Sequence, residues 1–283
     1  MKLVRFRARH DPAGRVSIGS LSADERHVRP CGDSLTELLE AADPVAAAES
    51  AAAGSERPLA ELEILPPVER QEVWAAGVTY LRSKAARMEE SEFSATAYDR
   101  VYEAERPELF FKATPERVVG PDDTIGIRRD SRWTVPEPEL ALYFNSRGRV
   151  VGCTVGNDVS ARDIEGENLL YLPQAKIFTG SGALGPWVTV GVTEEAVRSW
   201  TISLQIERAG ATVFSGQTEV GRLKRRFAEL GRFLFASQHF PHGVVLLTGT
   251  GIVPPDDFTL HPGDEVAIAI SGIGTLRNRA VVV

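Results

Sequence analysis

The sequence has few of the residues that cross-link a chain or anchor it in a membrane. It has 2 cysteines among 283 residues, too few for a disulfide framework and without zinc-site spacing. No apolar run approaches the roughly 18 residues that a membrane span needs, and the N-terminus alternates polar and apolar residues instead of forming a signal peptide. Lys and Arg number 32 against 39 Asp and Glu. This acidic balance argues against nucleic acid or an anionic membrane as the main partner. With only two cysteines far apart in the sequence, we expect a reduced, cytoplasmic setting.

The composition is that of an ordinary globular protein, with 43% hydrophobic and 25% charged residues. Residues 1–68 differ from the rest: a strand and turn-rich sequence are followed by helical stretches at 35–42 and 44–53, and two prolines at 66–67 end the region. We predict a small N-terminal α+β domain at residues 1–68 and a second, larger domain at residues 69–283.

Strand signals dominate the larger region. Apolar stretches bounded by Gly and Pro turns predict strands near residues 73–78, 109–112, 140–144, 150–156, 187–192, 201–207, 244–248 and 265–270. Helices are predicted at 80–104 and at 217–237, where apolar residues recur every three or four positions. Many strands with few helices between them indicate an α+β fold that is mainly β.

Three acidic residues are the main functional signal. Glu137 and Glu139 are two residues apart, so in a strand their side chains point to the same face. Asp158, in the next predicted element, supplies a third carboxylate. Like charges this close repel each other unless a hard divalent cation such as Mg²⁺ holds them through oxygen ligands. From spacing alone, Glu137 and Glu139 also fit a solvent-facing pair on an edge strand, because Pro136 and Pro138 suit an edge.

Ordered motifs over residues 73–283 favour the metal site. They are Gly77-Val78-Thr79-Tyr80, Leu109-Phe110-Phe111-Lys112, Glu137-Pro138-Glu139-Leu140, Asn157-Asp158-Val159-Ser160-Ala161-Arg162-Asp163, Ala175-Lys176, Leu184-Gly185-Pro186-Trp187, Leu247-Thr248-Gly249-Thr250, Pro262-Gly263-Asp264 and Gly272 to Asn278. In this order they resemble the fumarylacetoacetate hydrolase family. The segments around residues 106–114, 133–139 and 163–176 are most similar to one branch, the 2-keto-3-deoxy-D-arabinonate dehydratases.

The resemblance implies a rolled, barrel-like mixed β-sheet and one divalent metal, Mg²⁺ with Mn²⁺ and Ca²⁺ as alternatives, that holds a small 2-oxo acid. It places the metal ligands at Glu137, Glu139 and Asp158, and the active-site lysine at Lys176. It also implies a homodimer or homotetramer. Further residues expected to contact the substrate are Tyr80, Arg82, Phe111, Glu167, Gly249 and Thr250.

One departure bears on the reaction. Many family members carry a histidine three residues after the tyrosine of the Gly-x-x-Tyr motif, and this histidine activates water for carbon–carbon cleavage. Here the position is Ser83, and none of the five histidines lies nearby. We therefore expect Mg²⁺-dependent dehydration of 2-dehydro-3-deoxy-D-arabinonate to 2,5-dioxopentanoate, in pentose catabolism. The alternative is a metal-dependent hydrolase that cleaves a C–C bond of an acylpyruvate or diketo acid.

Dehydration needs proton transfers at C3 and C4, which we assign jointly to Glu108 and Lys176. Glu108 adjoins an apolar strand, where a carboxylate is either desolvated or paired with a cation. Five other charged residues are assigned as follows. Lys112 fits the surface and the site equally well, Arg162 is expected to pair with Asp163, and Glu167 is preferred to Glu165 as the carboxylate near the substrate.

Overall fold

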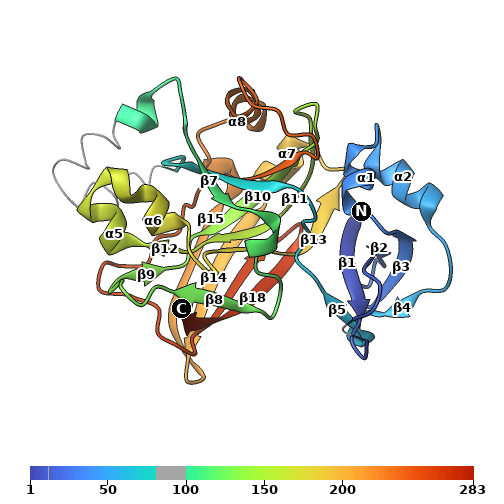
Figure 1. The fold of residues 1–283 in the computed structure, drawn as a ribbon, viewed down its shortest axis with the longest axis horizontal. Helices are drawn as coiled ribbons and strands as arrows, with labels where there is room; N and C mark the ends of the chain where they lie inside the picture. Colours follow the sequence, from blue (N-terminus) through green and yellow to red (C-terminus); the bar gives the residue numbers. More distant parts are fainter. Residues whose placement is uncertain (12, 81–99) are drawn as a thin grey trace.

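The structure is a computed structural model that describes residues 1–11, 13–80 and 100–283. Two sheets dominate it, and an N-terminal unit lies at one end (Figure 1). As predicted, the fold is mainly β, and every strand expected from the sequence is present. Of the helix predicted at 80–104, residues 100–103 are helical, and 81–99 lie outside the described residues.

The N-terminal unit, residues 1–68, contains five strands and two helices. β1 (Lys2–Ala8) pairs with β2 (Ser17–Leu21) and β5 (Leu62–Ile64), and β3 (His27–Gly32) links β2 to β4 (Arg57–Pro58). α1 (Leu35–Glu40) and α2 (Pro44–Ala51) confirm the two predicted helices, with Ser34 and Asp43 as N-caps. A 3₁₀ turn, η1 (Leu59–Glu61), precedes β5. Within β1, Lys2 and Leu3 pair with β13 of the larger region, so one sheet runs through both parts of the chain. The domain boundary at residue 68 stays a prediction.

The larger sheet continues from β1 in the order β13, β11, β10, β16, β6, β7. All these neighbours run antiparallel except β16 and β6, which are parallel. The strands are β6 (Glu72–Gly77), β7 (Glu108–Ala113), β10 (Pro138–Phe144), β11 (Val150–Asp158), β13 (Gly182–Val190) and β16 (Val244–Leu247).

A second sheet of five strands packs against the first through a continuous apolar core. Its order is β15 (Ala211–Glu219), β14 (Thr201–Arg208), β17 (Glu265–Ile270), β18 (Gly274–Val282) and β8 (Thr124–Ile127). Leu140, Leu142 and Phe144 of β10 share this core with Leu204 of β14 and Ile268 of β17. Because side chains alternate along a strand, Glu139 and Ala141 point to the opposite face of β10.

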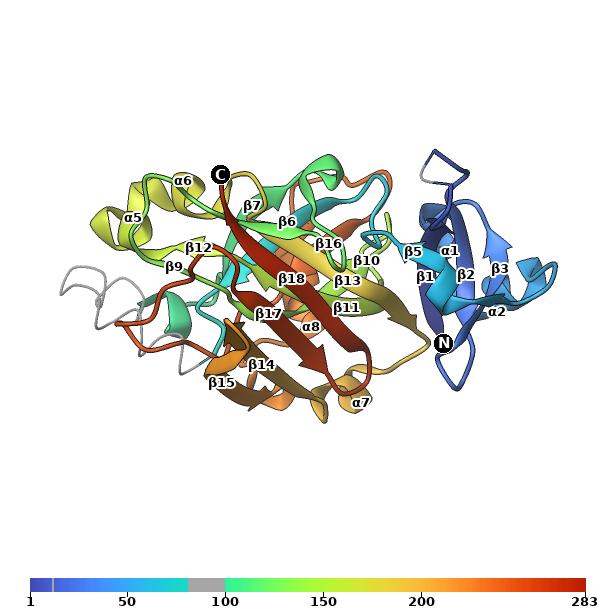
Figure 2. The ribbon, with the colours of Figure 1, turned by 90° about the horizontal axis from the view of Figure 1, so that it is seen from below.

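Short elements cover that opposite face at the end of the molecule away from the N-terminal unit (Figures 1 and 2). They are β9 (Thr134–Val135), β12 (Ser160–Ala161), α5 (Arg162–Glu167), η3 (Leu169–Tyr171) and α6 (Leu172–Lys176). The remaining elements are η2 (Pro115–Arg117), α7 (Glu194–Arg198), η4 (Val220–Arg222) and α8 (Phe227–Leu234).

The helix predicted at 217–237 is wrong in its first half. Residues up to Glu219 continue β15, η4 is a single 3₁₀ turn, and the helix begins only at Phe227 after an extended Arg226. Val220 and Leu223 are buried as their spacing suggested, but they enter the core from a turn. Helical spacing of buried residues therefore did not require a helix here.

None of the helices in the described part of the chain combines the length and the apolar composition that a membrane span requires.

Candidate active site

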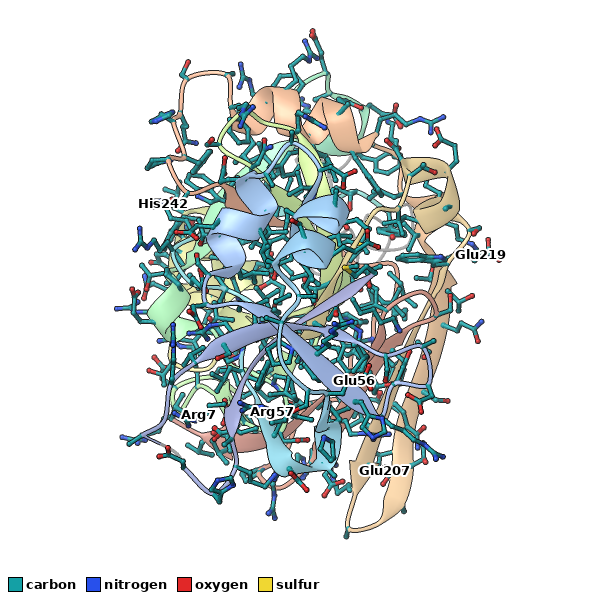
Figure 3. The ribbon with its side chains drawn as sticks, turned by 90° about the vertical axis from the view of Figure 1, so that its right-hand side faces the viewer. Arg7, Glu56, Arg57, Glu207, Glu219 and His242 are labelled. Atoms are coloured by element: carbon teal, nitrogen blue, oxygen red, sulfur yellow. The ribbon has the colours of Figure 1, made fainter. Side chains whose placement is uncertain are left out.

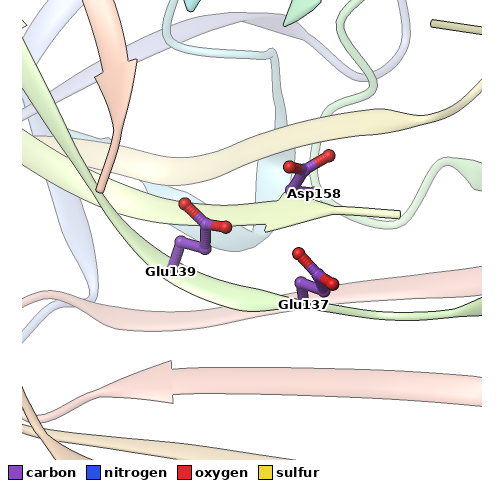
Figure 4. A group of neighbouring side chains, drawn as sticks. All are labelled: Glu137, Glu139 and Asp158. Carbon is purple, nitrogen blue, oxygen red and sulfur yellow. The ribbon is translucent and has the colours of Figure 1, made fainter. Parts of the chain in front are cut away.

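The three predicted metal ligands lie together on one face of the larger sheet. Glu137 precedes β10, Glu139 lies within it, and Asp158 ends the neighbouring strand β11. Glu139 is opposite Gly156, so Glu139 and Asp158 share a face. A Cβ at 156 would lie 2.2 Å from Leu247 Cδ2, so glycine there lets Leu247 pack between the strands. One carboxylate oxygen of each residue lies within 4.8 Å of the others. Figure 4 shows the three side chains converging; we call them the carboxylate cluster.

The cluster is removed from solvent. Glu137, Glu139 and Asp158 are 3%, 1% and 1% exposed. Burial raises the pKa of Glu139 well above its usual range, and the nearby charges of Asp158 and Glu137 raise it further, while the hydrogen bond from the Gly249 backbone N–H opposes this. Three buried carboxylate donors, one of them held ionised only with difficulty, suit a hard divalent cation with oxygen ligands.

Three cationic side chains surround the cluster. Lys176 Nζ donates hydrogen bonds to Glu137 Oε2 at 2.9 Å, Asp158 Oδ2 at 3.2 Å and Ser160 Oγ at 2.6 Å. Arg162 Nη2 donates to Glu137 Oε1 at 2.9 Å, and Lys112 Nζ forms an ion pair with Asp158 Oδ1. These cations are at most 1% exposed. Glu137 and Asp158 are therefore each held by two of these cations, whereas Glu139 accepts a hydrogen bond from the backbone N–H of Gly249.

The expected pair between Arg162 and Asp163 is wrong. Arg162 turns inward to Glu137, whereas Asp163 accepts hydrogen bonds from Ser131 Oγ and from the backbone N–H of Arg132. Adjacent residues at the start of α5 point in different directions, since neighbouring side chains on a helix are about 100° apart. Ser160, which the sequence did not single out, accepts a hydrogen bond from Lys176.

Strand β7 contributes alternate side chains to the site. Glu108 lies over Gly77 of β6, where a Cβ atom would be 1.9 Å from Glu108 Oε2. Phe110 borders the cluster, with Lys176 Nζ 5.7 Å from its ring centre. Phe111 points to the other face of the strand and packs edge-on against Trp74 at 5.9 Å. The structure thus places Phe110, and not Phe111, beside the carboxylates, and strand alternation from Glu108 would have indicated this.

Gly249 and Thr250 lie on the other side of the cluster. The Gly249 N–H donates to Glu139 Oε2 at 2.6 Å. Gly249 has φ 90°, and a Cβ there would lie 2.0 Å from Thr79 Oγ1, so only glycine fits. Thr250 borders the cluster, and its hydroxyl closes a turn with Ile252. Both residues are where the resemblance placed them, and their roles stay predictions.

Two cavities lie near Glu108. A small cavity of about 10 Å³ borders the carboxylate cluster and Gly77, over which Glu108 lies. A larger one of about 340 Å³ is lined by Glu108 itself, together with Glu165, Arg106, Leu169 and Leu172. Glu165 is 1% exposed, whereas Glu167 is exposed. The sequence preferred Glu167 as the carboxylate near the substrate, whereas Glu165 is the one that the structure buries beside the larger cavity. Glu165 is three residues after Arg162 and so shares its inward helix face.

Two predicted substrate contacts complete the comparison with the sequence. Tyr80 is 2% exposed, and burial raises its pKa; its ring lies close to Gly251, one residue beyond Thr250. Arg82 lies outside the described residues, as does Ser83. The structure therefore brings together Glu108, Lys176, Gly249, Thr250 and the carboxylate cluster, and leaves Phe111 and Glu167 facing elsewhere.

The fold is mainly β, and its site combines three buried carboxylates with a buried lysine. This combination is typical of enzymes that bind a hard divalent cation. The chain belongs to the fumarylacetoacetate hydrolase family: the family model described as "Fumarylacetoacetate (FAA) hydrolase C-terminal" matches residues 72–281. This agrees with the resemblance seen in the ordered motifs.

Individual relatives indicate which members of the family the chain resembles. A Haloferax volcanii protein named "Probable 2-keto-3-deoxyxylonate dehydratase" is 48% identical over 217 residues, 77% of this chain and 74% of the relative. The Saccharolobus solfataricus "2-dehydro-3-deoxy-D-arabinonate dehydratase" is 42% identical over 219 residues, 76% of this chain and 74% of the relative. A solved structure titled "2-keto-3-deoxy-D-arabinonate dehydratase complexed with magnesium and 2,5-dioxopentanoate" superposes with a TM-score of 0.85 at 34% identity, covering 100% of this chain and 99% of that one.

Proposed function

We propose that this protein is a Mg²⁺-dependent hydro-lyase that converts 2-dehydro-3-deoxy-D-arabinonate to 2,5-dioxopentanoate and water, in pentose catabolism. The observation that carries the proposal is the buried carboxylate cluster beside Lys176. It occurs in a chain that is 34% identical, over its full length, to a dehydratase solved with magnesium and this product. The cytoplasmic location and the homodimeric or homotetrameric state stay predictions.

The donor set fits the metal. Glu137, Glu139 and Asp158 would hold Mg²⁺ through carboxylate oxygens, as hard cations prefer. Bound there, Mg²⁺ supplies Lewis acidity to the oxygens of a 2-oxo acid and so makes the C3 proton easier to remove. The side chains around the cluster account for the rest of the chemistry.

Lys176 is suited to act as a fixed positive charge. An ammonium group has three hydrogens, and Lys176 Nζ donates to three oxygens, those of Glu137, Asp158 and Ser160. A lysine with this many acceptors is stabilised as the cation, and at 0% exposure its charge acts in a poorly solvated site. We assign to Lys176 the stabilisation of negative charge that develops on the substrate when C3 loses its proton.

Glu108 is the better candidate for moving protons. Its side chain is half-buried, lines the larger cavity and lies over Gly77, which borders the small one. In the proposed step its carboxylate takes a proton from C3 and gives it to the departing C4 hydroxyl. The C4–O bond breaks, water leaves, and Glu108 returns to its ionised form. The unsaturated acid then tautomerises through C5 to the aldehyde.

The experiment is a coupled assay with purified protein, Mg²⁺ and 2-keto-3-deoxy-D-arabinonate. A dehydrogenase that oxidises 2,5-dioxopentanoate reports the product through its cofactor. We expect cofactor reduction that EDTA abolishes and Mg²⁺ restores. Cleavage of an acylpyruvate into two acids, with no dehydration, would contradict the proposal and favour the C–C hydrolase.

A further inference from the structure

Lys112 is a fully buried cation that the chemistry above does not use. The sequence assigned it equally to the surface and to the site; the structure places it at 0% exposure, on the same face of β7 as Glu108 and Phe110. Burial lowers its pKa, and the negative charge of Asp158 opposes this. A lysine in such a position destabilises the fold unless its ammonium group is fully hydrogen-bonded.

The ammonium group joins three separate parts of the site. Lys112 Nζ forms an ion pair with Asp158 Oδ1. It also donates hydrogen bonds to the backbone carbonyl of Val159 at 3.2 Å and to the backbone carbonyl of Lys176 at 2.5 Å. Two hydrogen bonds and one ion pair therefore compensate the buried ammonium group. One side chain therefore connects a predicted metal ligand, the residue after it and the backbone of the active-site lysine.

We propose that Lys112 is a positioning residue that fixes Lys176 relative to Asp158, an inference that rests on the proposed function. The two oxygens of Asp158 are held by different lysines: Oδ1 by Lys112 and Oδ2 by Lys176. Lys112 also holds the backbone of Lys176, so it sets both ends of the contact between Lys176 and Asp158.

The location of Lys176 explains why such a connection is needed. Lys176 is the last residue of α6, a helix of five residues. Helices this short are not stable by themselves, and their last carbonyls have no partner within the helix. Lys112 satisfies the carbonyl of Lys176 from a strand of the larger sheet. The lysine is thereby attached to a rigid element and not only to its own short helix.

A simpler role for Lys112 makes the opposite prediction for metal binding. If Lys112 only balanced the charge of Asp158, its removal would leave more negative charge and would strengthen Mg²⁺ binding. If Lys112 orients Asp158, its removal lets the carboxylate rotate and weakens Mg²⁺ binding, because groups that support a metal ligand typically change affinity by about 10–100-fold. The sign of the change in Mg²⁺ affinity therefore separates the two roles.

The experiment compares wild type with Lys112→Met, which keeps an unbranched apolar stem and removes the ammonium. Mg²⁺ affinity is measured by calorimetric titration, and kcat and KM by the coupled assay. We expect Mg²⁺ to bind about 10-fold more weakly and kcat to fall by about 10–100-fold, with a smaller change in KM. Lys112→Gln, which retains hydrogen-bond donors, is the second variant should Lys112→Met not fold.

Arg208→Met is the matched control, because Arg208 pairs with Asp264, a 0% exposed carboxylate away from the cluster. This variant also leaves a buried carboxylate without its cation, and we expect it to lower Tm while retaining kcat and Mg²⁺ affinity. Unchanged or tighter Mg²⁺ binding in the Lys112 variants, with kcat retained, would overturn the positioning role. If wild type does not dehydrate the sugar acid, the proposed function fails, and the Mg²⁺ affinities still test Lys112.

Discussion

The N-terminal unit and the carboxylate cluster contain the same charged residue types in opposite surroundings. In the N-terminal unit, Arg7 pairs with Glu63 at 2.6 Å, and their side chains are 29% and 37% exposed. Arg7 lies on the outside of this unit, as Figure 3 shows. At the carboxylate cluster, Glu137 pairs with the neighbouring Lys176 at 2.9 Å, and the Lys176 and Glu137 side chains are 0% and 4% exposed. Similar geometry therefore occurs once in water and once in the protein interior.

The two pairs differ in what they contribute. An exposed ion pair exchanges water for a partner of similar strength, so its net effect on stability is small. A buried pair has lost its water, and a well-packed apolar pair of the same volume is often as stable or more stable. Six charged side chains buried together, the three carboxylates and the three cations around them, are thus poorly explained by stability, and this contrast supports a catalytic role for the site.

The contrast is tested most strongly by Lys176→Met. This change removes the cation that contacts Glu137 and Asp158 and leaves both carboxylates with fewer partners. Because Lys176 is proposed to stabilise developing negative charge, we expect kcat to fall by about 10²–10³-fold, measured with the coupled assay.

The control is Lys2→Met in the N-terminal unit, where Lys2 pairs with an exposed Glu25. That variant is expected to match wild type in both kcat and Tm. Near-normal turnover in Lys176→Met would mean that the buried lysine serves the fold alone.

Glu139→Gln separates metal binding from stability. The substitution removes one of three mutually repelling carboxylates, and an amide oxygen can still accept the Gly249 N–H. We expect Mg²⁺ affinity to fall by about 100-fold or more. We also expect the Tm of the EDTA-treated protein to rise, by about 2–4 °C for each kcal/mol of repulsion removed. Calorimetric titration and thermal unfolding measure the two effects, and a lower Tm without metal would contradict the like-charge argument.

Glu165 and Glu167 form a matched pair on one short helix. Glu165 is buried and lines the larger cavity with Glu108, whereas Glu167 is exposed. We expect Glu165→Gln to reduce kcat/KM by about 10-fold, the effect of one lost hydrogen bond to a charged group. Glu167→Gln is expected to match wild type. Equal kinetics in the two variants would show that the larger cavity does not contact the reacting substrate.

The sequence predicted the parts of the site that depend on local spacing. Glu137 and Glu139 share a face because a strand alternates, and Asp158 joins them because β10 and β11 are antiparallel neighbours. The ordered motifs also placed Lys176 and Gly249 beside the cluster, where the structure has them. The positions of the three carboxylates follow from two strands that are neighbours in the chain, and those of Lys176 and Gly249 from the motifs that contain them.

What the sequence did not predict depends on long-range packing. The burial of Lys112 follows from Val159 and Lys176, which are 47 and 64 residues away in the chain. Arg162 could face Asp163 or Glu137, and only the position of α5 over the sheet decides this. For Phe110 and Phe111, strand alternation from Glu108 gives the residue on the Glu108 face, but that this face meets the cluster depends on how β7 pairs with β6.

The last prediction concerns how folding stability depends on pH in metal-free protein. Glu63 in the N-terminal unit and Glu139 in the cluster should change the stability in opposite directions as pH rises. The Arg7 hydrogen bond lowers the pKa of Glu63 below its usual 4.5. Its stabilisation is therefore present above about pH 4.5 and is lost as pH falls through the lowered pKa. Burial raises the pKa of Glu139 above 4.5. Its folded state favours the proton, so that stabilisation is present below about pH 4.5 and is lost as pH rises through the raised pKa.

Thermal unfolding from acid to neutral pH in EDTA, with wild type, Glu63→Gln and Glu139→Gln, separates these contributions. Glu139→Gln should remove the loss of Tm as pH rises. Glu63→Gln should lower Tm slightly at neutral pH only, and high salt should abolish its effect because the pair is exposed. If Glu139→Gln followed the wild-type pH profile, the destabilisation that we attribute to burying the ionised carboxylate of Glu139 would be absent. The surface pair and the cluster would then differ in exposure but not in energy.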